Sequence, residues 1–322
     1  MIKKLLAGLL MGCALLPLWG EVGVLSVTDE DVHTQKEDFW HTFEYYIVAP
    51  DGKTTKCQAT RVAKNWFATA AHCVAVPCAK SCKLRIDLLE QPVSAFVDGK
   101  HSRKKPIVFV HPSYKLNESI GQDFALIHMN LSLLPVRYYR RPTGEQTVNR
   151  LIFRKEFETF LKENPPARRE LDRAMRPKLP PILVFDNSTW RIDRTLSVVA
   201  IFDGVREILH NPYPTDYVKE VGFAYTQNFG VRKGMSGSGV MTNTGELAGI
   251  ISASVLALHK AKQDKEYFTF AVFNEDLTDF MRQVMGSDYD KIDFKQAAPN
   301  YVTRSPTDHS DIVQAAKNLK LK

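Results

Sequence analysis

Short segments of alternating apolar and polar residues dominate the first part of the chain. Residues 42–48 and 57–62 are rich in β-branched and aromatic side chains, and the turn sequence Pro50-Asp-Gly52 lies between them. This arrangement predicts a β-hairpin. Similar short segments follow at 84–89, 93–97, 107–110 and 123–128. Many short strands separated by turn residues favour an all-β barrel or sandwich.

The pattern changes at about residue 137. Phe153, Phe157 and Phe160 recur at helical spacing, and Pro165-Pro166 ends the run. Residues 137–178 carry 12 Lys and Arg against 6 Asp and Glu, so they hold +6 of the formal net charge of +7. Basic helices bind nucleic acid or anionic membranes in some proteins, but no aromatic-interleaved nucleic-acid motif accompanies this one. We therefore expect a partly helical surface insertion at about 137–180 and no nucleic-acid partner.

Strand-like segments return after the insertion and continue almost to the end of the chain. They lie at 181–185, 196–202, 240–244, 247–254 and 267–273. Asn274 is then placed to cap a C-terminal helix, and the apolar residues of that helix share one face: Leu277, Phe280, Met281 and Val284. Residues 286–322 are polar with scattered lysines, which predicts a C-terminal tail.

The first 20 residues have the pattern of a secretory signal peptide. Two lysines precede an apolar run from Leu5 to Trp19 that contains Pro17 and is too short to span a membrane. We predict cleavage after Gly20, a lead-in at 21–37, and export to the periplasm or medium with no membrane span remaining. The alternative is a lipoprotein signal in which Cys13 is acylated.

The candidate chemistry centres on the glycine-rich run Val231–Val240. Gly234, Gly237 and Gly239 allow a tight turn with positive φ around Ser236. Such a turn holds a serine hydroxyl outward and aims the N–H groups of Gly234 and Ser236 at one point, as an oxyanion hole requires. By itself the run is more typical of a Gly/Ser turn between two strands.

Two further motifs supply what a nucleophilic serine needs. Thr69-Ala-Ala-His-Cys73 contains His72, and Gln122-Asp-Phe-Ala-Leu-Ile127 contains Asp123. A serine hydroxyl becomes a good nucleophile when a base takes its proton and an acid group fixes the tautomer of that base. The chain order is His72, Asp123, Ser236, with separations of 51 and 113 residues.

These local sequences resemble the chymotrypsin/trypsin-type serine proteases. The matching motifs are Ala70-Ala-His-Cys73, Asp123-Phe-Ala-Leu126 and Gly234-Met-Ser-Gly237, together with the strand-like stretch Val108–Tyr114. The resemblance covers roughly residues 40–283, less the insertion. It implies two antiparallel β-barrels of chymotrypsin type in a protease domain at 38–285, with a cleft between them.

The resemblance also implies a function and its residues. His72, Asp123 and Ser236 would form the catalytic triad, and the N–H groups of Gly234 and Ser236 the oxyanion hole. The implied activity is that of an exported serine endopeptidase acting on protein or peptide substrates through an acyl-enzyme, with no metal or cofactor. The alternative is a catalytically silent binding protein on the same fold, because Met235 stands where activatable members have an aspartate that holds the turn.

Substrate-binding residues are implied less specifically. Ser252 resembles the serine that supports the triad aspartate, and Ser252-Ala253-Ser254 would line the substrate site. Gly230 stands six residues before Ser236, where a trypsin carries its specificity aspartate. Gly-Met-Ser-Gly-Ser has some resemblance to the glutamyl-endopeptidase branch, and the substrate side chain stays open.

Four cysteines remain after signal removal, an even number in an exported chain. Cys57 and Cys73 are 16 residues apart, the spacing of the disulfide beside the histidine in this family, which leaves Cys78 and Cys82 as a short local pair. The alternative is a zinc site made from His72, Cys73, Cys78 and Cys82.

Overall fold

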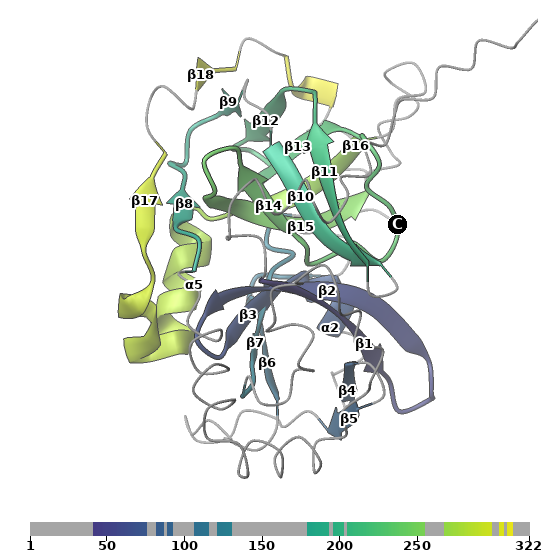
Figure 1. Ribbon diagram of the computed structural model, residues 1–322. Coiled ribbons are helices and arrows are strands. Elements are labelled where there is room, and N and C mark those ends of the chain that lie inside the picture. The colour runs from purple at the N-terminus through teal and green to yellow at the C-terminus, as the bar shows by residue number, and fades with distance from the viewer. Residues whose placement is uncertain are drawn as a thin grey trace, which may run out of the picture.

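The computed structural model describes two β-sheet bodies packed on each other, with one helix along their side (Figure 1). The described residues are 41–75, 82–86, 89–92, 106–115, 121–130, 179–192, 196–202, 205–254, 267–297, 303–305 and 308–311. The signal peptide, the lead-in, the helical insertion at 137–178, the segment 93–97 and Cys78 lie outside the described residues.

The first body is a seven-stranded sheet in the order β5-β4-β1-β2-β3-β7-β6. Its described pairings are all antiparallel. The strands are β1 (Thr42–Val48), β2 (Thr54–Ala63), β3 (Trp66–Thr69), β4 (Lys83–Ile86), β5 (Leu89–Pro92), β6 (Ile107–Val110) and β7 (Ala125–His128). The predicted hairpin is β1 and β2, and the short helix α2 (Ala71–Val74) follows β3 directly.

The second body is an eleven-stranded sheet whose main path is β11-β10-β14-β15-β16-β13-β12-β9-β18, with β8 pairing β15 and β17. The strands are β8 (Ile182–Val184), β9 (Trp190–Ile192), β10 (Leu196–Phe202), β11 (Val205–Asn211), β12 (Thr215–Val218), β13 (Phe223–Gln227), β14 (Gly239–Thr242), β15 (Leu247–Ser254), β16 (Tyr267–Val272), β17 (Phe294–Gln296) and β18 (Thr303–Arg304). The all-β, chymotrypsin-type fold expected from the sequence is confirmed.

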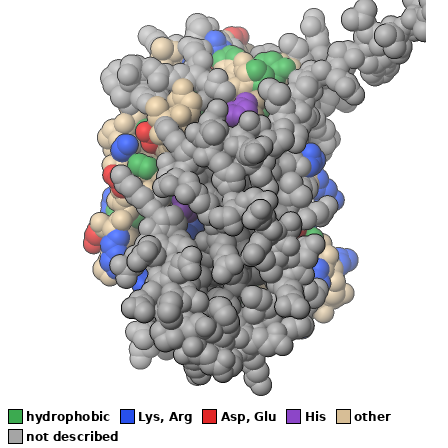
Figure 2. All heavy atoms as spheres, viewed as in Figure 1, with side chains coloured by type: hydrophobic (Ala, Val, Ile, Leu, Met, Phe, Trp, Pro, Cys, Tyr) green, Lys and Arg blue, Asp and Glu red, His purple; other side chains and the backbone are tan. Residues whose placement is uncertain are grey.

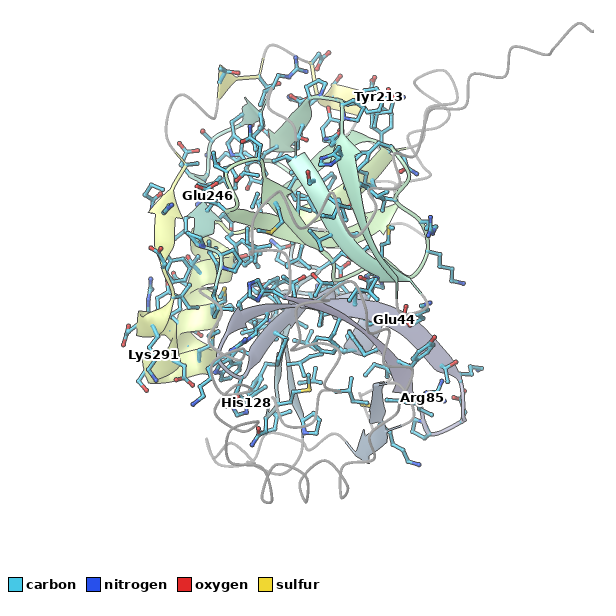
Figure 3. The ribbon with its side chains drawn as sticks, in the orientation of Figure 1. Glu44, Arg85, His128, Tyr213, Glu246 and Lys291 are labelled. Carbon is cyan, nitrogen blue, oxygen red and sulfur yellow. A yellow bond between two sulfur atoms is a disulfide. The ribbon has the colours of Figure 1, made fainter. Side chains whose placement is uncertain are left out.

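Each sheet encloses its own apolar core, and a third cluster joins the two. Phe43, Tyr45 and Phe67 belong to the core of the first sheet. The third cluster includes Trp66 and Phe124 from the first body and extends to residues of the second sheet and the C-terminal helix. Side chains of both sheets crowd the space between them in Figure 3, where Glu44 marks the first body and Glu246 the second.

The C-terminal helix α5 (Glu275–Met285) forms where its capping and apolar patterns place it. Asn274 accepts a hydrogen bond from the N–H of Leu277 at 3.1 Å, which satisfies one of the free N–H groups of the first turn. Leu277, Phe280 and Met281 are buried in the third cluster. The helix therefore packs against residues of both sheets, beside them in Figure 1.

The chain beyond α5 also joins the second sheet. The 3-10 helix η4 (Gly286–Lys291) leads into β17, which pairs in parallel with β8, and β18 pairs antiparallel with β9. The sequence predicted only a polar tail here. Strands of three and two residues are too short to show an alternation of apolar and polar residues. They form because the edge of the sheet supplies their hydrogen-bond partners.

His111, directly after β6, connects the first body to α5. Its ring packs edge-on against Phe280 with centroids 5.0 Å apart, and its Nε2 lies 3.6 Å from Asp276 Oδ1. The Nδ1 atom accepts a hydrogen bond from the N–H of Ser113. Burial lowers the pKa of His111 below its ordinary value of 6.5, and the nearby Asp276 carboxylate offsets part of that shift.

Replacing His111 with glutamine should flatten the fall in thermal stability below about pH 6.5. The unfolded chain binds a proton at the ordinary histidine pKa and the folded chain resists it, so stability is fully present above that pH and is lost as pH falls toward the folded pKa. Calorimetric Tm between pH 8 and pH 5 measures this. Asp276→Asn is the matched control and should steepen the wild-type slope, whereas parallel curves for all three proteins would contradict the assignment.

Candidate active site

His72 lies on α2, and the burial of its neighbours aims its ring outward. Ala71, Cys73 and Val74 are buried, whereas the His72 side chain is 30% exposed. A disulfide between Cys73 and Cys57 fastens this short helix to β2, with the two Cα atoms 6.3 Å apart. Closing a loop of this length stabilises the fold by about 3 kcal/mol in the chain-entropy account.

The disulfide bears on the alternative zinc site. That site needs Cys73 as a thiolate, and its sulfur is bonded to Cys57. Cys57, His72 and Cys73 do place their donor atoms within 4.8 Å of one another, but two of these donors are the sulfurs of one disulfide. Cys82 is disulfide-bonded as well, and its expected partner Cys78 lies outside the described residues.

Asp123 precedes β7 and is 4% exposed. Its Oδ1 accepts from the backbone N–H of His72 and its Oδ2 contacts His72 Nδ1, both at 2.7 Å. The hydroxyl of Ser252 also donates to Oδ2. A carboxylate at Nδ1 favours the tautomer that carries the proton there, which leaves Nε2 as the acceptor.

Ser236 completes a continuous hydrogen-bonded chain. Its Oγ lies 3.0 Å from Nε2 of His72, within the reach that a base and a nucleophile need. The structure therefore brings together His72, Asp123 and Ser236, the three residues selected from separate sequence motifs.

The turn around Ser236 has the backbone that its glycines predict. Gly234 has φ 95° and Gly237 has φ 93°, values that L side chains rarely adopt. The N–H of Gly237 donates to the carbonyl of Ile251 at 2.8 Å. Among the described residues, the N–H groups of Gly234 and Ser236 donate to no backbone acceptor.

Burial of the Met235 side chain supports this turn. Met235 is fully buried in the core of the second sheet, and its sulfur accepts a hydrogen bond from the N–H of Arg232 at 3.4 Å. Just upstream, the Asn228 side chain accepts from the N–H groups of Gly230 and Val231 at 3.0 and 2.8 Å. Sequence reasoning missed Asn228, although an asparagine two residues before a glycine is a common turn signal.

The expected substrate residues follow on β15. Ser252 is buried, and its hydroxyl is hydrogen-bonded to Asp123, the residue that it was predicted to support. Ser254 pairs with Phe268 of β16, which places the backbone of residues 253 and 254 in the sheet. The side chains of Ala253 and Ser254 lie outside the described set, so their contact with substrate stays a prediction.

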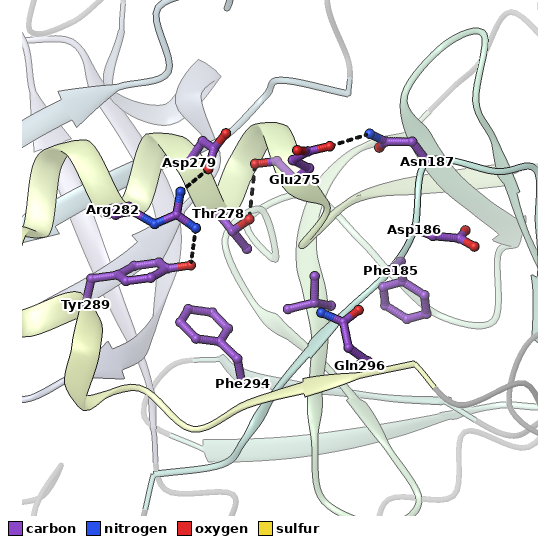
Figure 4. Close-up of a pocket in the computed structure, with 11 residues that line it drawn as sticks. Phe185, Asp186, Asn187, Glu275, Thr278, Asp279, Arg282, Tyr289, Phe294 and Gln296 are labelled. Carbon is purple, nitrogen blue, oxygen red and sulfur yellow. Dashed lines mark hydrogen bonds and ion pairs between the residues drawn. The ribbon is translucent and has the colours of Figure 1, made fainter.

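A separate cavity of about 590 Å³ lies between α5, β8 and β17 (Figure 4). Arg282 contacts Asp279 and the Tyr289 hydroxyl on one side of it, and Asn187 donates to Glu275 on the other. No triad residue lines this cavity.

The described surface carries mixed charge. Lys and Arg side chains are scattered along both edges of the face in Figure 2, with Asp and Glu side chains among those on one edge. No helix in the described part of the chain has the length and apolar character needed to cross a membrane.

Comparison with known proteins gives one family match. The trypsin family model matches residues 36–151. No curated protein matches the sequence.

Similar solved structures include the protease Anisep from Arthrobacter nicotinovorans, with 12% identity, coverage of 80% of this chain and 97% of that chain, and a TM-score of 0.41. The Rv3671c protease from M. tuberculosis in its active form has 12% identity, 79% and 83% coverage, and a TM-score of 0.40. A Glu endopeptidase has 12% identity, 78% and 92% coverage, and a TM-score of 0.39. The part of the chain at residues 36–151 is thus similar to the trypsin family, and the two described sheets agree with the two-barrel fold of trypsin-like proteases.

Proposed function

We propose that this protein is an exported serine endopeptidase that cleaves peptide bonds through an acyl-enzyme. Its trypsin-like fold supports a serine protease function. The observation that carries the specific proposal is the chain of contacts from Asp123 through His72 to Ser236, at 2.7 and 3.0 Å.

In this proposal each group has a role in acyl transfer. Ser236 Oγ attacks the scissile carbonyl carbon while Nε2 of His72 takes the hydroxyl proton. Asp123 stabilises the imidazolium that forms. The negative charge that develops on the carbonyl oxygen is met by the N–H groups of Gly234 and Ser236.

The same residues complete the reaction. The tetrahedral intermediate collapses when His72 gives its proton to the leaving amine, which leaves the acyl group on Ser236 Oγ. A water molecule then gives a proton to His72 and attacks the acyl carbon. Collapse of this second tetrahedral intermediate returns the proton to Ser236 and releases the carboxylic acid, so water is the only reactant besides the substrate.

The observations favour this enzyme over a silent protein on the same fold. The silent alternative supposed that the turn collapses without the family's aspartate. Here burial of Met235 and the Asn228 hydrogen bonds support the turn, and Gly234 keeps a positive φ of 95°. Export is supported by the disulfide, since such bonds persist in oxidising compartments.

A fluorophosphonate probe should react with the folded protein at a single residue, Ser236. Peptide mapping by mass spectrometry locates the adduct. Ser238, two residues away, is fully buried and serves as the internal control, because general hydroxyl reactivity would not select Ser236. An unlabelled folded protein, or one labelled only after denaturation, would exclude the proposed enzyme.

A further inference from the structure

Gln58 is a polar residue inside a buried strand. It lies in the part of β2 where Cys57, Ala59 and Thr60 are also buried, and it is fully buried itself. A carboxamide in such a place needs hydrogen-bond partners, because an unpaired buried amide destabilises the fold. Its partners come from distant parts of the chain.

The carboxamide of Gln58 connects the first sheet to the second. Its Nε2 donates to the carbonyl of Ile201, and its Oε1 accepts from the N–H of the same residue, both at 2.8 Å. The hydroxyl of Ser238 donates to the same Oε1 at 2.9 Å. One side chain thus holds a strand of the second sheet and the segment directly after Ser236.

The backbone of Gln58 contacts the same segment. Its N–H donates to the carbonyl of Ser236 at 2.7 Å, and its own carbonyl accepts from Thr69 Oγ1 at 2.7 Å. Thr60, two residues along β2, donates from its hydroxyl to the carbonyl of Gly237 at 3.1 Å. Residues 236–238 are therefore fixed against β2 over their whole length.

This contact lies between the parts of the fold that carry His72 and Ser236. His72 belongs to the first body, through α2, and Ser236 to the second, so their separation depends on how the two bodies are joined. Cys57, the neighbour of Gln58, carries the disulfide that fastens α2. The strand β2 is thus joined through Cys57 to α2, which carries His72, and through Gln58 to the segment at residues 236–238.

We propose that Gln58 is a positioning residue for the reaction, acting with Ser238 as its hydrogen-bond partner. This inference rests on the proposed peptidase function. The carboxamide keeps Ser236 Oγ within reach of His72 Nε2 by fixing the Ser236–Ser238 segment and β10 at once. A misplacement of about 1 Å between reacting groups lowers rates by about 10²-fold.

The test compares Gln58→Leu, Ser238→Ala and the double variant with wild type in steady-state hydrolysis of a peptide substrate. We expect kcat to fall about 10²-fold in Gln58→Leu and about tenfold in Ser238→Ala, with KM within about twofold of wild type. The double variant should lose no more than Gln58→Leu alone, because both changes remove the same bond. Fully multiplicative losses would overturn the pairing.

Thr226→Ala is the matched control. Thr226 is a buried residue of the second sheet whose hydroxyl donates to the carbonyl of Pro214 at 3.0 Å and accepts from the side-chain amide of Asn211 at 3.2 Å, so its loss also removes hydrogen bonds inside the fold. It should lower Tm at least as much as Ser238→Ala and leave kcat unchanged. If Ser238→Ala and Gln58→Leu lower Tm but keep wild-type kcat, Gln58 is only structural and the inference fails while the peptidase stands.

A readout without catalysis separates the two proposals. The Gly237 N–H, bonded to Ile251, should exchange with solvent at least about tenfold faster in Ser238→Ala than in wild type, while amides of β16 keep their rates. Failure of wild type to react with the fluorophosphonate would refute the peptidase. Unchanged Gly237 exchange in both single variants would refute the role of Gln58 in holding the turn.

Discussion

Replacing Ser236 with alanine should lower kcat by about 10⁶-fold, the loss in kcat measured when a protease triad loses its nucleophile. The Oγ atom is the group that forms the covalent bond to the acyl carbon, and His72 Nε2 contacts it at 3.0 Å. The substitution removes one half-buried hydroxyl and adds nothing, so Tm should stay within about 2 °C of wild type. Single-turnover hydrolysis of an activated ester and a peptide measures the loss.

Asp123→Asn provides a graded comparison for that result. An amide at this position accepts from Nδ1 or donates to it, so the tautomer of His72 is no longer fixed, and comparable triads lose about 10⁴-fold in kcat. Ser236→Ala should abolish fluorophosphonate labelling, and Asp123→Asn should slow it. Activity of Ser236→Ala above about one percent of wild type, in preparations free of contaminating protease, would show that another residue is the nucleophile.

Replacing Gly237 with alanine should abolish activity and destabilise the fold by about 3 kcal/mol or more. An added Cβ would lie 1.7 Å from the backbone carbonyl oxygen of Gln58 and 2.6 Å from Thr69 Oγ1. The φ of 93° adds strain for any L side chain. Because the nearest atom belongs to the backbone of a buried strand, relief requires the two bodies to move apart at the triad.

Gly52→Ala isolates the cost of the backbone conformation. Gly52 has φ 80° in the hairpin turn, and an added Cβ there meets nothing within 4 Å. It should cost about 1 kcal/mol and leave kcat unchanged. Urea unfolding and peptide hydrolysis measured on both variants test the difference, and equal losses of stability in the two would contradict a steric clash at Gly237.

The triad could be predicted because each member sits in its own short motif. His72, Asp123 and Ser236 are each recognisable from four or five neighbouring residues, and their joint geometry follows once the fold is known. Strands β1, β10 and β15 were predicted from strand-like segments of 7 or 8 residues. The C-terminal helix was predictable because Asn274 and its apolar face are both local signals.

What the sequence did not reveal depends on contacts between distant segments. Gln58 reads as an ordinary polar residue of a strand, since its partner Ile201 is 143 residues away. Strands β9, β12 and β13 have 3 to 5 residues, and most of their residues are buried, so they lack the alternation of a half-exposed strand. Their existence is decided by the sheet that pairs with them.

The pairing of β17 with β8 also affects the protein's behaviour in concentrated solution. Without residues 286–297, β8 would keep only its short parallel pairing with β15, and its N–H and C=O groups on the other side would form an open edge able to pair with another chain. Phe294, which stacks near Tyr289 with centroids 4.8 Å apart, would leave an apolar gap beside that edge. The segment after the last helix thus protects this protein against edge-to-edge aggregation, and a shortened form ending at Met285 would be prone to self-association.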